Sequence, residues 1–117
     1  MSKSGKVTVL TDATFNDYIS RHAWCIVDFW AEWCVPCGPM SRVVEVVASE
    51  LVGRVDFASV DMEENRANAA RLGIMALPTN VIFRNGTVVD SIVGSMPKQA
   101  FLERIHSRLD DPVYSSP

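Results

Sequence analysis

The sequence predicts a single α/β domain with a mixed central β-sheet flanked by helices. Strand-like apolar runs alternate with helix-like segments from the start of the chain, which is typical of parallel βαβ units. Further along, an Asn85-Gly86 pair separates two apolar runs and is the strongest short-range signal of an antiparallel hairpin. The chain of 117 residues is long enough for one hydrophobic core and too short for two domains.

Apolar periodicity locates the first elements. Residues 6–10 alternate as a short strand, and Thr11-Asp12 offers a cap for a helix with one apolar face around residues 15–19. Residues 24–30 are apolar on both faces apart from Asp28, as expected of a strand that helices cover on both sides. This strand is therefore expected in the middle of the sheet.

The next elements are a long helix, a strand and a short helix. A helix is expected at about 34–51, and its valines make it depend on packing rather than on intrinsic propensity. Residues 55–60 form the next strand-like run. Asp61 with Glu64 three positions later is a capping pattern for a short helix that ends near Gly73.

The last part of the chain holds the hairpin and the final helix. Strands are expected at 80–83 and 87–93 on either side of the Asn-Gly turn, and Pro97 suits the first turn of a helix. These elements place the domain at residues 7–109. Residues 1–6 are an N-terminal extension, and residues 110–117 lack periodicity and are expected to form a disordered tail.

Composition excludes several classes of function. The net charge is −3 and there is no basic block, so neither nucleic-acid binding nor membrane binding is expected. No apolar run is as long as a membrane span, and the first residues lack the apolar core of a signal peptide, so we expect a cytoplasmic protein. We also expect this protein to be a monomer. Three cysteines, an odd number, argue against a secreted disulfide framework and favour catalysis or metal binding.

Cys34, Val35, Pro36 and Cys37 form a Cys-x-x-Cys motif where the central strand meets the long helix. A helix N-terminus favours a thiolate through its free backbone N–H groups and its partial positive charge. Disulfide exchange needs one accessible thiolate and a second thiol that releases the mixed disulfide. We therefore assign Cys34, at the start of the helix, as the nucleophile. Cys37, one turn further in and shielded, is assigned as the resolving thiol.

A zinc site is the structural alternative, because His22, Cys25, Cys34 and Cys37 make up a nominal Cys3His ligand set. Cys25 starts the strand and Cys34 follows its far end, and about six extended residues span roughly 20 Å at about 3.3 Å each. Tetrahedral ligands, in contrast, lie about 2.3 Å from the metal. This geometry weighs against zinc, and Cys25 is expected to be a small buried hydrophobe.

Asp28 is a carboxylate in an otherwise apolar strand, a placement that is costly unless the group is paired or protonated. Desolvation should raise the pKa of Asp28, which suits a general acid or base. The alternative is a structural aspartate whose hydrogen bonds come from the backbone.

The run WAEWCVPC, preceded by VDF and followed further along by Leu77-Pro78-Thr79, resembles the thioredoxin family over residues 7–109. The resemblance implies the thioredoxin fold and a protein-disulfide reductant and electron carrier. Its redox group would be a Cys34–Cys37 disulfide, with no bound cofactor and no metal. Its partners would be thioredoxin reductase and client proteins with reducible disulfides.

The resemblance also assigns roles around the cysteines. Asp28 would transfer protons to and from Cys37, and Pro78 would be a cis-proline that keeps a backbone edge open for the client chain. A flat apolar surface around Cys34 would contact the client. Its members would be Trp33, Pro36, Met75, Ala76, Leu77, Pro78 and Gly94.

Three positions depart from the pattern of the family. Ser59 stands where many members have a lysine beside the buried aspartate, which predicts a raised Asp28 pKa and slower proton transfer. Val35 and Gly38 leave the motif without a nearby charge. The thiolate then gains little extra stabilisation, so the dithiol should be a good reductant.

Two other functions stay open from the sequence. The chain would be a docking module if its thiols did not matter, or a disulfide isomerase or oxidase if the couple were more oxidising. The intact Cys-x-x-Cys motif, Asp28 and Pro78 favour the reductant, since a docking module has no need for all three. The uncharged Val35-Pro36 pair and the lack of a secretory signal weigh against the isomerase or oxidase.

Overall fold

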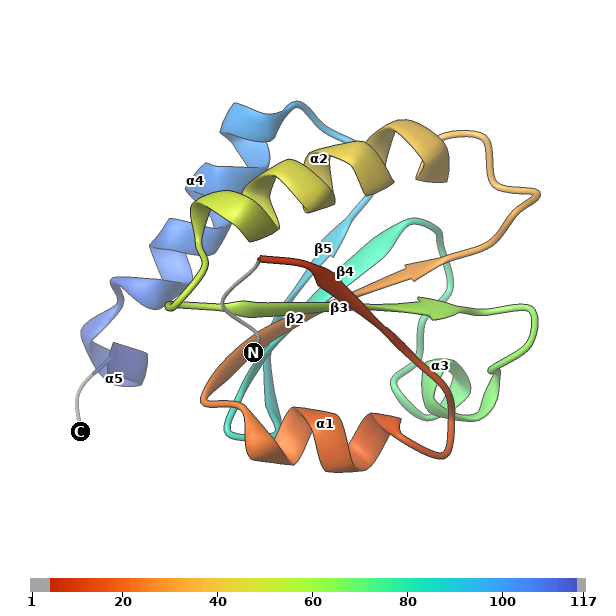
Figure 1. Ribbon diagram of the computed structural model, residues 1–117, viewed down its shortest axis with the longest axis horizontal. Helices are drawn as coiled ribbons and strands as arrows, with labels where there is room; N and C mark the ends of the chain where they lie inside the picture. The colour runs from red at the N-terminus through yellow and green to blue at the C-terminus, as the bar shows by residue number, and fades with distance from the viewer. Residues whose placement is uncertain (1–4, 116–117) are drawn as a thin grey trace.

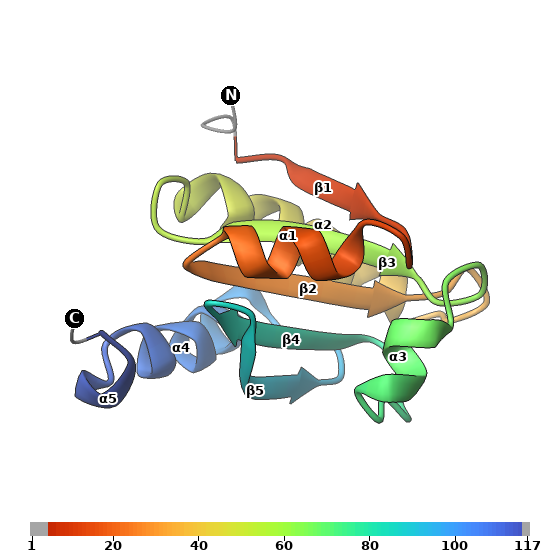
Figure 2. The same ribbon diagram turned by 90° about the horizontal axis from the view of Figure 1, so that it is seen from below.

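The computed structural model describes residues 5–115 and contains one five-stranded sheet. Its strands are β1 (Val7–Leu10), β2 (Trp24–Trp30), β3 (Asp56–Asp61), β4 (Thr79–Arg84) and β5 (Thr87–Val93). They lie in the order β1-β3-β2-β4-β5, as Figure 2 shows. β1 and β2 pair parallel with β3, whereas β4 pairs antiparallel with β2 and with β5. The mixed sheet predicted from the sequence is confirmed.

Helices cover both faces of this sheet. They are α1 (Phe15–Arg21), α2 (Cys37–Glu50), α3 (Ala67–Arg71) and α4 (Lys98–Leu109), followed by the short α5 (Pro112–Ser115). In Figure 1, α2 and α4 lie on one side of the sheet, and α1 and α3 lie on the other. None of the helices described within residues 5–115 is long and apolar enough to cross a membrane.

Each face of the sheet has its own hydrophobic core. Between the sheet and α1, Phe15 packs against Phe29 and Phe83, with ring centroids 5.9 and 5.8 Å apart. On the opposite face, Ile26 and Ile82 belong to the core that α2 and α4 cover. Strand β2 contributes to both cores and is buried except at its two ends, as predicted for the central strand.

The β4–β5 hairpin turns at the predicted Asn-Gly pair. Asn85 has φ 52° and Gly86 has φ 84°, so both central residues take the left-handed conformation that a type I′ turn requires. This region is disfavoured for most side chains, which explains the choice of asparagine and glycine. The hairpin prediction is confirmed.

Two predicted helix caps are wrong. Thr11-Asp12 does not cap α1, whose N-cap is Thr14; instead the Asp12 carboxylate accepts hydrogen bonds from the backbone N–H groups of Ala67 (3.1 Å) and Asn68 (3.2 Å) at the start of α3. The Asp61 carboxylate accepts a hydrogen bond from the N–H of Glu63, at 3.0 Å, and not from a residue of α3. The cap of α3 therefore comes from a loop that is far away in sequence, which a local pattern does not reveal.

Helix α2 begins at Cys37 and not near residue 34. Pro36 is its N-cap residue, and the turn before it is closed by Cys37 N–H donating to the Cys34 carbonyl at 3.1 Å. Pro39 consequently falls in the first turn, where backbone N–H groups have no intrahelical partner and a proline is tolerated. Cys34 thus lies just ahead of the helix, and Cys37 is its first residue.

The C-terminal segment differs from the predicted disordered tail. Residues Pro112–Ser115 form α5, and the Tyr114 ring stands edge-on to Trp24 with centroids 6.3 Å apart. A single aromatic contact of this kind leaves no periodic signal in the sequence. The predicted extension at residues 1–4 and the end of the tail at residues 116–117 lie outside the described residues.

Candidate active site

Cys34 and Cys37 lie at the junction of β2 and α2 and form a disulfide, with Cα atoms 5.4 Å apart. Cys34 is 8% exposed and Cys37 is 2% exposed, so their order of accessibility is the predicted one. Cys34 is nevertheless largely covered, because Ala31 and Leu77 pack with the two cysteines in one small cluster. The pair can therefore accept two electrons at a protected but reachable sulfur.

The start of α2 provides a favourable field for a thiolate. A helix N-terminus carries a partial positive charge, and the first turn of α2 holds no acidic residue that would offset it. Val35, Pro36 and Gly38 are exposed and uncharged. The field at the cysteines thus comes from the backbone and not from a neighbouring ammonium or imidazolium group.

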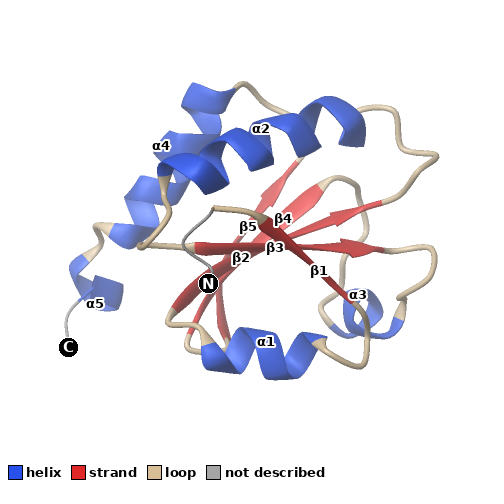
Figure 3. Ribbon diagram, viewed as in Figure 1, coloured by secondary structure: helices blue, strands red, loops and turns tan. Residues whose placement is uncertain are grey.

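The loop before β4 meets the cysteines from the other side of the junction. Its Leu77 side chain packs on the Cys34–Cys37 cluster, and the Leu77–Pro78 peptide bond is cis, as the family resemblance implied. Pro78 is itself buried, and its carbonyl accepts a hydrogen bond from Gly94 N–H at 2.8 Å. Figure 3 shows that the loops after β2 and before β4 lie at the same end of the sheet.

Large apolar side chains are exposed around this junction. Met75 is 95% exposed, Val35 is 85% exposed and Trp33 is 64% exposed. Trp33 also lines a cavity of about 300 Å³ together with Ala69 and Ala70 of α3. Val93, next to Gly94, is a further exposed apolar residue that the sequence analysis did not single out.

Asp28 is buried in β2 on the face that α2 covers, the same face as the cysteines. Its register partners are Ser59 on β3 and Asn80 on β4. Burial raises the pKa of Asp28 from an ordinary 3.8 to about 7, and hydrogen bonds from Asn80 and Ser41 act in the opposite direction. The predicted direction of the shift is confirmed, and its main cause is desolvation.

Two residues of this region, Ser41 and Asn80, were missed from the sequence. Ser41 and Trp30 line both the hollow at the cysteines and a hollow of about 230 Å³ that reaches Asp28. Ser41 follows Cys37 by four positions on α2, which places it on the same helix face. Asn80 is fully buried, and its Nδ2 lies 3.4 Å from Asp28 Oδ1.

Cys25 is unpaired and belongs to the core on the opposite face of the sheet, with Phe29 and Val27. Burial and the nearby Asp56 carboxylate raise the pKa of the Cys25 thiol to about 12. A thiol in this environment is unreactive, so Cys25 behaves as the small buried hydrophobe that was predicted. Among residues 5–115, no group of three or more histidine, cysteine or acidic side chains is placed to hold a metal ion.

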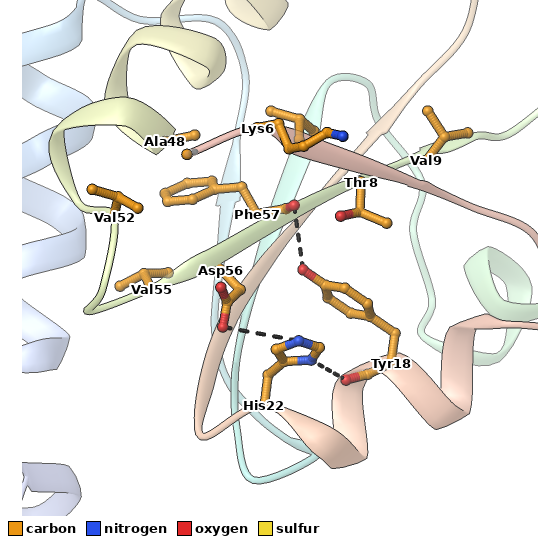
Figure 4. A pocket seen from close by; sticks show the side chains of 12 residues that line it. Lys6, Thr8, Val9, Tyr18, His22, Ala48, Val52, Val55, Asp56 and Phe57 are labelled. Carbon is orange, nitrogen blue, oxygen red and sulfur yellow. Dashed lines mark hydrogen bonds and ion pairs between the residues drawn. The ribbon is translucent and has the colours of Figure 1, made fainter. Parts of the chain in front are cut away.

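A cavity of about 510 Å³, drawn in Figure 4, has neither cysteine of the pair among its lining residues. It is bordered by the first residues of β1 and β3, whereas the cysteines follow the end of β2, which runs parallel to β3. The Tyr18 hydroxyl donates to the Phe57 carbonyl at 3.3 Å, and His22 lies 3.9 Å from the Asp56 carboxylate. These polar groups interact with one another, which is the arrangement expected of a structural cluster.

Comparisons with known proteins agree with this geometry. A family model described as Thioredoxin matches residues 6–107. The chain is 36% identical over 103 residues to a thioredoxin of Staphylococcus saprophyticus, covering 88% of this chain and 98% of that protein. A thioredoxin of Staphylococcus aureus is 35% identical with the same coverage. The structure of a mutant thioredoxin from Halobacterium salinarum NRC-1 matches with a TM-score of 0.82 at 29% identity, over 92% of this chain and 94% of that one.

Proposed function

The chain belongs to the thioredoxin family of thiol–disulfide oxidoreductases, and on that premise we propose that Cys34 attacks client disulfides and Cys37 releases the product. The observation that carries the proposal is the Cys34–Cys37 disulfide at the start of α2. Cys34 is the more exposed of the two sulfurs, and it precedes the helix that stabilises a thiolate.

The reduction proceeds in two exchanges. The Cys34 thiolate attacks one sulfur of the client disulfide, which forms a mixed disulfide and expels the other client sulfur as a thiolate. Cys37 then loses its proton and attacks the Cys34 sulfur, which expels the second client thiolate and forms the Cys34–Cys37 disulfide. Two electrons have passed to the client. A thioredoxin reductase, the kind of partner with which this family works, then supplies two electrons that reduce the Cys34–Cys37 disulfide again.

Asp28 is proposed as the base that takes the Cys37 proton. It lies beneath α2 on the same face of the sheet as Cys37, and burial brings its pKa to about 7, where the group exchanges protons near neutral pH. Ser41 lines the hollows at both Asp28 and Cys37, and its hydroxyl is a hydrogen-bond partner of Asp28. Without a lysine at Ser59, we expect this transfer to be slower than in relatives that have one.

The client surface is proposed to surround Cys34. Two observations support this proposal: Trp33 and Met75 are exposed, and Leu77 contacts the cysteine cluster. Such an exposed apolar patch marks a site for protein contact. The remaining members of the proposed surface are Pro36, Ala76, Pro78 and Gly94.

The direction of electron flow is proposed to be reductive. No charged side chain lies between the cysteines, so the thiolate is not stabilised beyond the effect of the helix and the disulfide stays comparatively stable. A cytoplasmic location fits this chemistry, because the disulfides found in a reducing compartment are usually catalytic ones. We propose a monomer with its domain at residues 7–109, no bound cofactor besides the disulfide, and neither nucleic acid nor membrane as a partner.

The test is to trap the mixed disulfide. In Cys37→Ser the first exchange still takes place but the second has no thiol to perform it, so a covalent adduct between Cys34 and a disulfide-bonded client protein should accumulate. Mass spectrometry of the digested adduct identifies the linked cysteine, and Cys25→Ala in the same background should leave the yield unchanged. An adduct at Cys25, or equal yields from Cys34→Ser and Cys37→Ser, would refute the assignment.

A further inference from the structure

The side chain of Asn80 uses only part of its hydrogen-bonding capacity. It is fully buried in β4, directly opposite Asp28 across the antiparallel β2–β4 pair. Its Nδ2 donates to Asp28 Oδ1 at 3.4 Å, whereas its Oδ1 has no hydrogen-bond partner among residues 5–115. A buried carbonyl without a partner costs free energy that an apolar side chain at this position would not cost. The amide therefore requires an explanation beyond packing.

The unpartnered oxygen matches the need of a protonated Asp28. An ionised carboxylate only accepts hydrogen bonds, but a carboxylic acid carries an O–H that must donate one. An asparagine amide presents a donor and an acceptor related by a half-turn about its last side-chain bond. Asn80 can therefore serve Asp28 in either state from the same position on β4.

We propose that Asn80 is a positioning residue of the thiol chemistry, whose amide donates to Asp28 when the carboxyl is ionised and, turned over, accepts from Asp28 when the carboxyl is protonated. The proposal rests on the proposed role of Asp28 as the base for Cys37. It adds the group that holds this base in place through both halves of its proton exchange.

The other neighbours of Asp28 strengthen this assignment. Ser59 faces Asp28 from β3, and Ser41 and Glu45 face the hollow at Asp28 from α2, while no lysine, arginine or histidine of the described chain lines that hollow. The negative charge of Asp28 thus depends on neutral hydrogen-bond donors. Hydrogen bonds to a charged group are stronger than those between neutral groups, so Asn80 favours the ionised form on balance.

Replacing Asn80 with an apolar residue of similar size should therefore disfavour the ionised form. In Asn80→Leu we expect the protonation midpoint of Asp28 to rise by about one pH unit, a tenfold change in its protonation constant. The ionised fraction at pH 7 then falls about fivefold, and the rate of the Cys37 step falls with it. At higher pH the rate should return toward that of the wild type, which a merely misfolded site would not do.

The experiment combines NMR titration and single-turnover kinetics on the full chain. The 13C resonance of the Asp28 carboxyl gives its midpoint, and the Asn80 side-chain amide resonances of the wild type should move with the same midpoint. The pH profile for reduction of a protein with one exposed disulfide gives the functional readout. Asn68→Leu is the matched control, because Asn68 is another buried asparagine that donates to a carboxylate, Asp12, at 3.1 Å.

The possible outcomes separate the two proposals. An upward shift of midpoint and pH profile in Asn80→Leu, absent in Asn68→Leu, supports the role of Asn80. An unshifted midpoint, or Asn80 amide resonances that do not titrate with Asp28 in the wild type, overturns it; the second measurement needs no variant to fold. If Asp28→Asn keeps the wild-type pH profile, the role of Asp28 itself fails. If Asp28→Asn flattens the profile but Asn80→Leu does not shift it, only the role of Asn80 fails.

Discussion

Cys34→Ser should lower the rate of disulfide reduction by roughly 10³-fold or more, down to the uncatalysed background. A serine hydroxyl is not ionised near neutral pH and does not attack sulfur, whereas the Cys34 thiol lies just before α2, where a thiolate is favoured. Cys37 is more deeply buried and is not expected to replace it as the attacking group. The rate is measured with a protein disulfide under excess dithiothreitol.

Two comparisons make the result specific. Cys25→Ala removes a thiol from the opposite core and should leave the rate unchanged. Binding of the client in its reduced form should survive in Cys34→Ser, because the apolar surface at Trp33 and Met75 is intact. Retention of most of the activity in Cys34→Ser would contradict the assignment of Cys34 as the nucleophile. A wild-type rate no higher than the background would instead favour the docking-module interpretation.

Asp28→Asn should stabilise the oxidised protein at pH 8 by roughly 3 to 4 kcal/mol while it slows the reaction. Burial raises the pKa of Asp28 to about 7 in the folded chain, against an ordinary 3.8. The contribution of Asp28 to the free energy of unfolding is fully present below pH ~4, where the carboxyl is protonated in both the folded and the unfolded chain. It is lost at about 1.4 kcal/mol per pH unit as the pH rises to about 7. Asparagine does not ionise and avoids the loss.

Chemical denaturation from pH 4 to pH 8 checks this prediction. The free energy of unfolding of the wild type relative to Asp28→Asn should decrease from about pH 4 to about pH 7 and level off above that. Taking the difference between the two proteins cancels other titrating groups, such as Asp12 and Asp90, whose pKa values are lowered. A pH-independent difference would show that Asp28 has an ordinary pKa and is no candidate for the base.

Much of the fold could be predicted because its signals are local. The hairpin follows from two residues, Asn85 and Gly86, that suit positive φ. The central position of β2 follows from its run of apolar residues, interrupted only by Asp28, and the site of Cys34 and Cys37 follows from the junction of that strand with a helix. Each of these features is encoded within a few neighbouring residues.

The features that were missed depend on contacts between distant parts of the chain. Asp12 caps α3 across a separation of 55 residues, and Tyr114 reaches Trp24 from the other end of the chain. Asn80 is different, because its signal was present. It is a polar residue in an apolar strand, the same pattern that singled out Asp28, and only the β2–β4 register reveals that the two face each other.

The most direct test of the account is the reduction potential of the Cys34–Cys37 pair, measured by equilibration against a defined thiol–disulfide buffer. The account predicts a two-electron transition near the reducing end of the scale, with about −270 mV, the value of thioredoxin itself, as the reference taken from the family. A potential of about −180 mV or higher would contradict the reductive direction and indicate an isomerase or an oxidase. The absence of any two-electron transition would contradict the redox function as a whole.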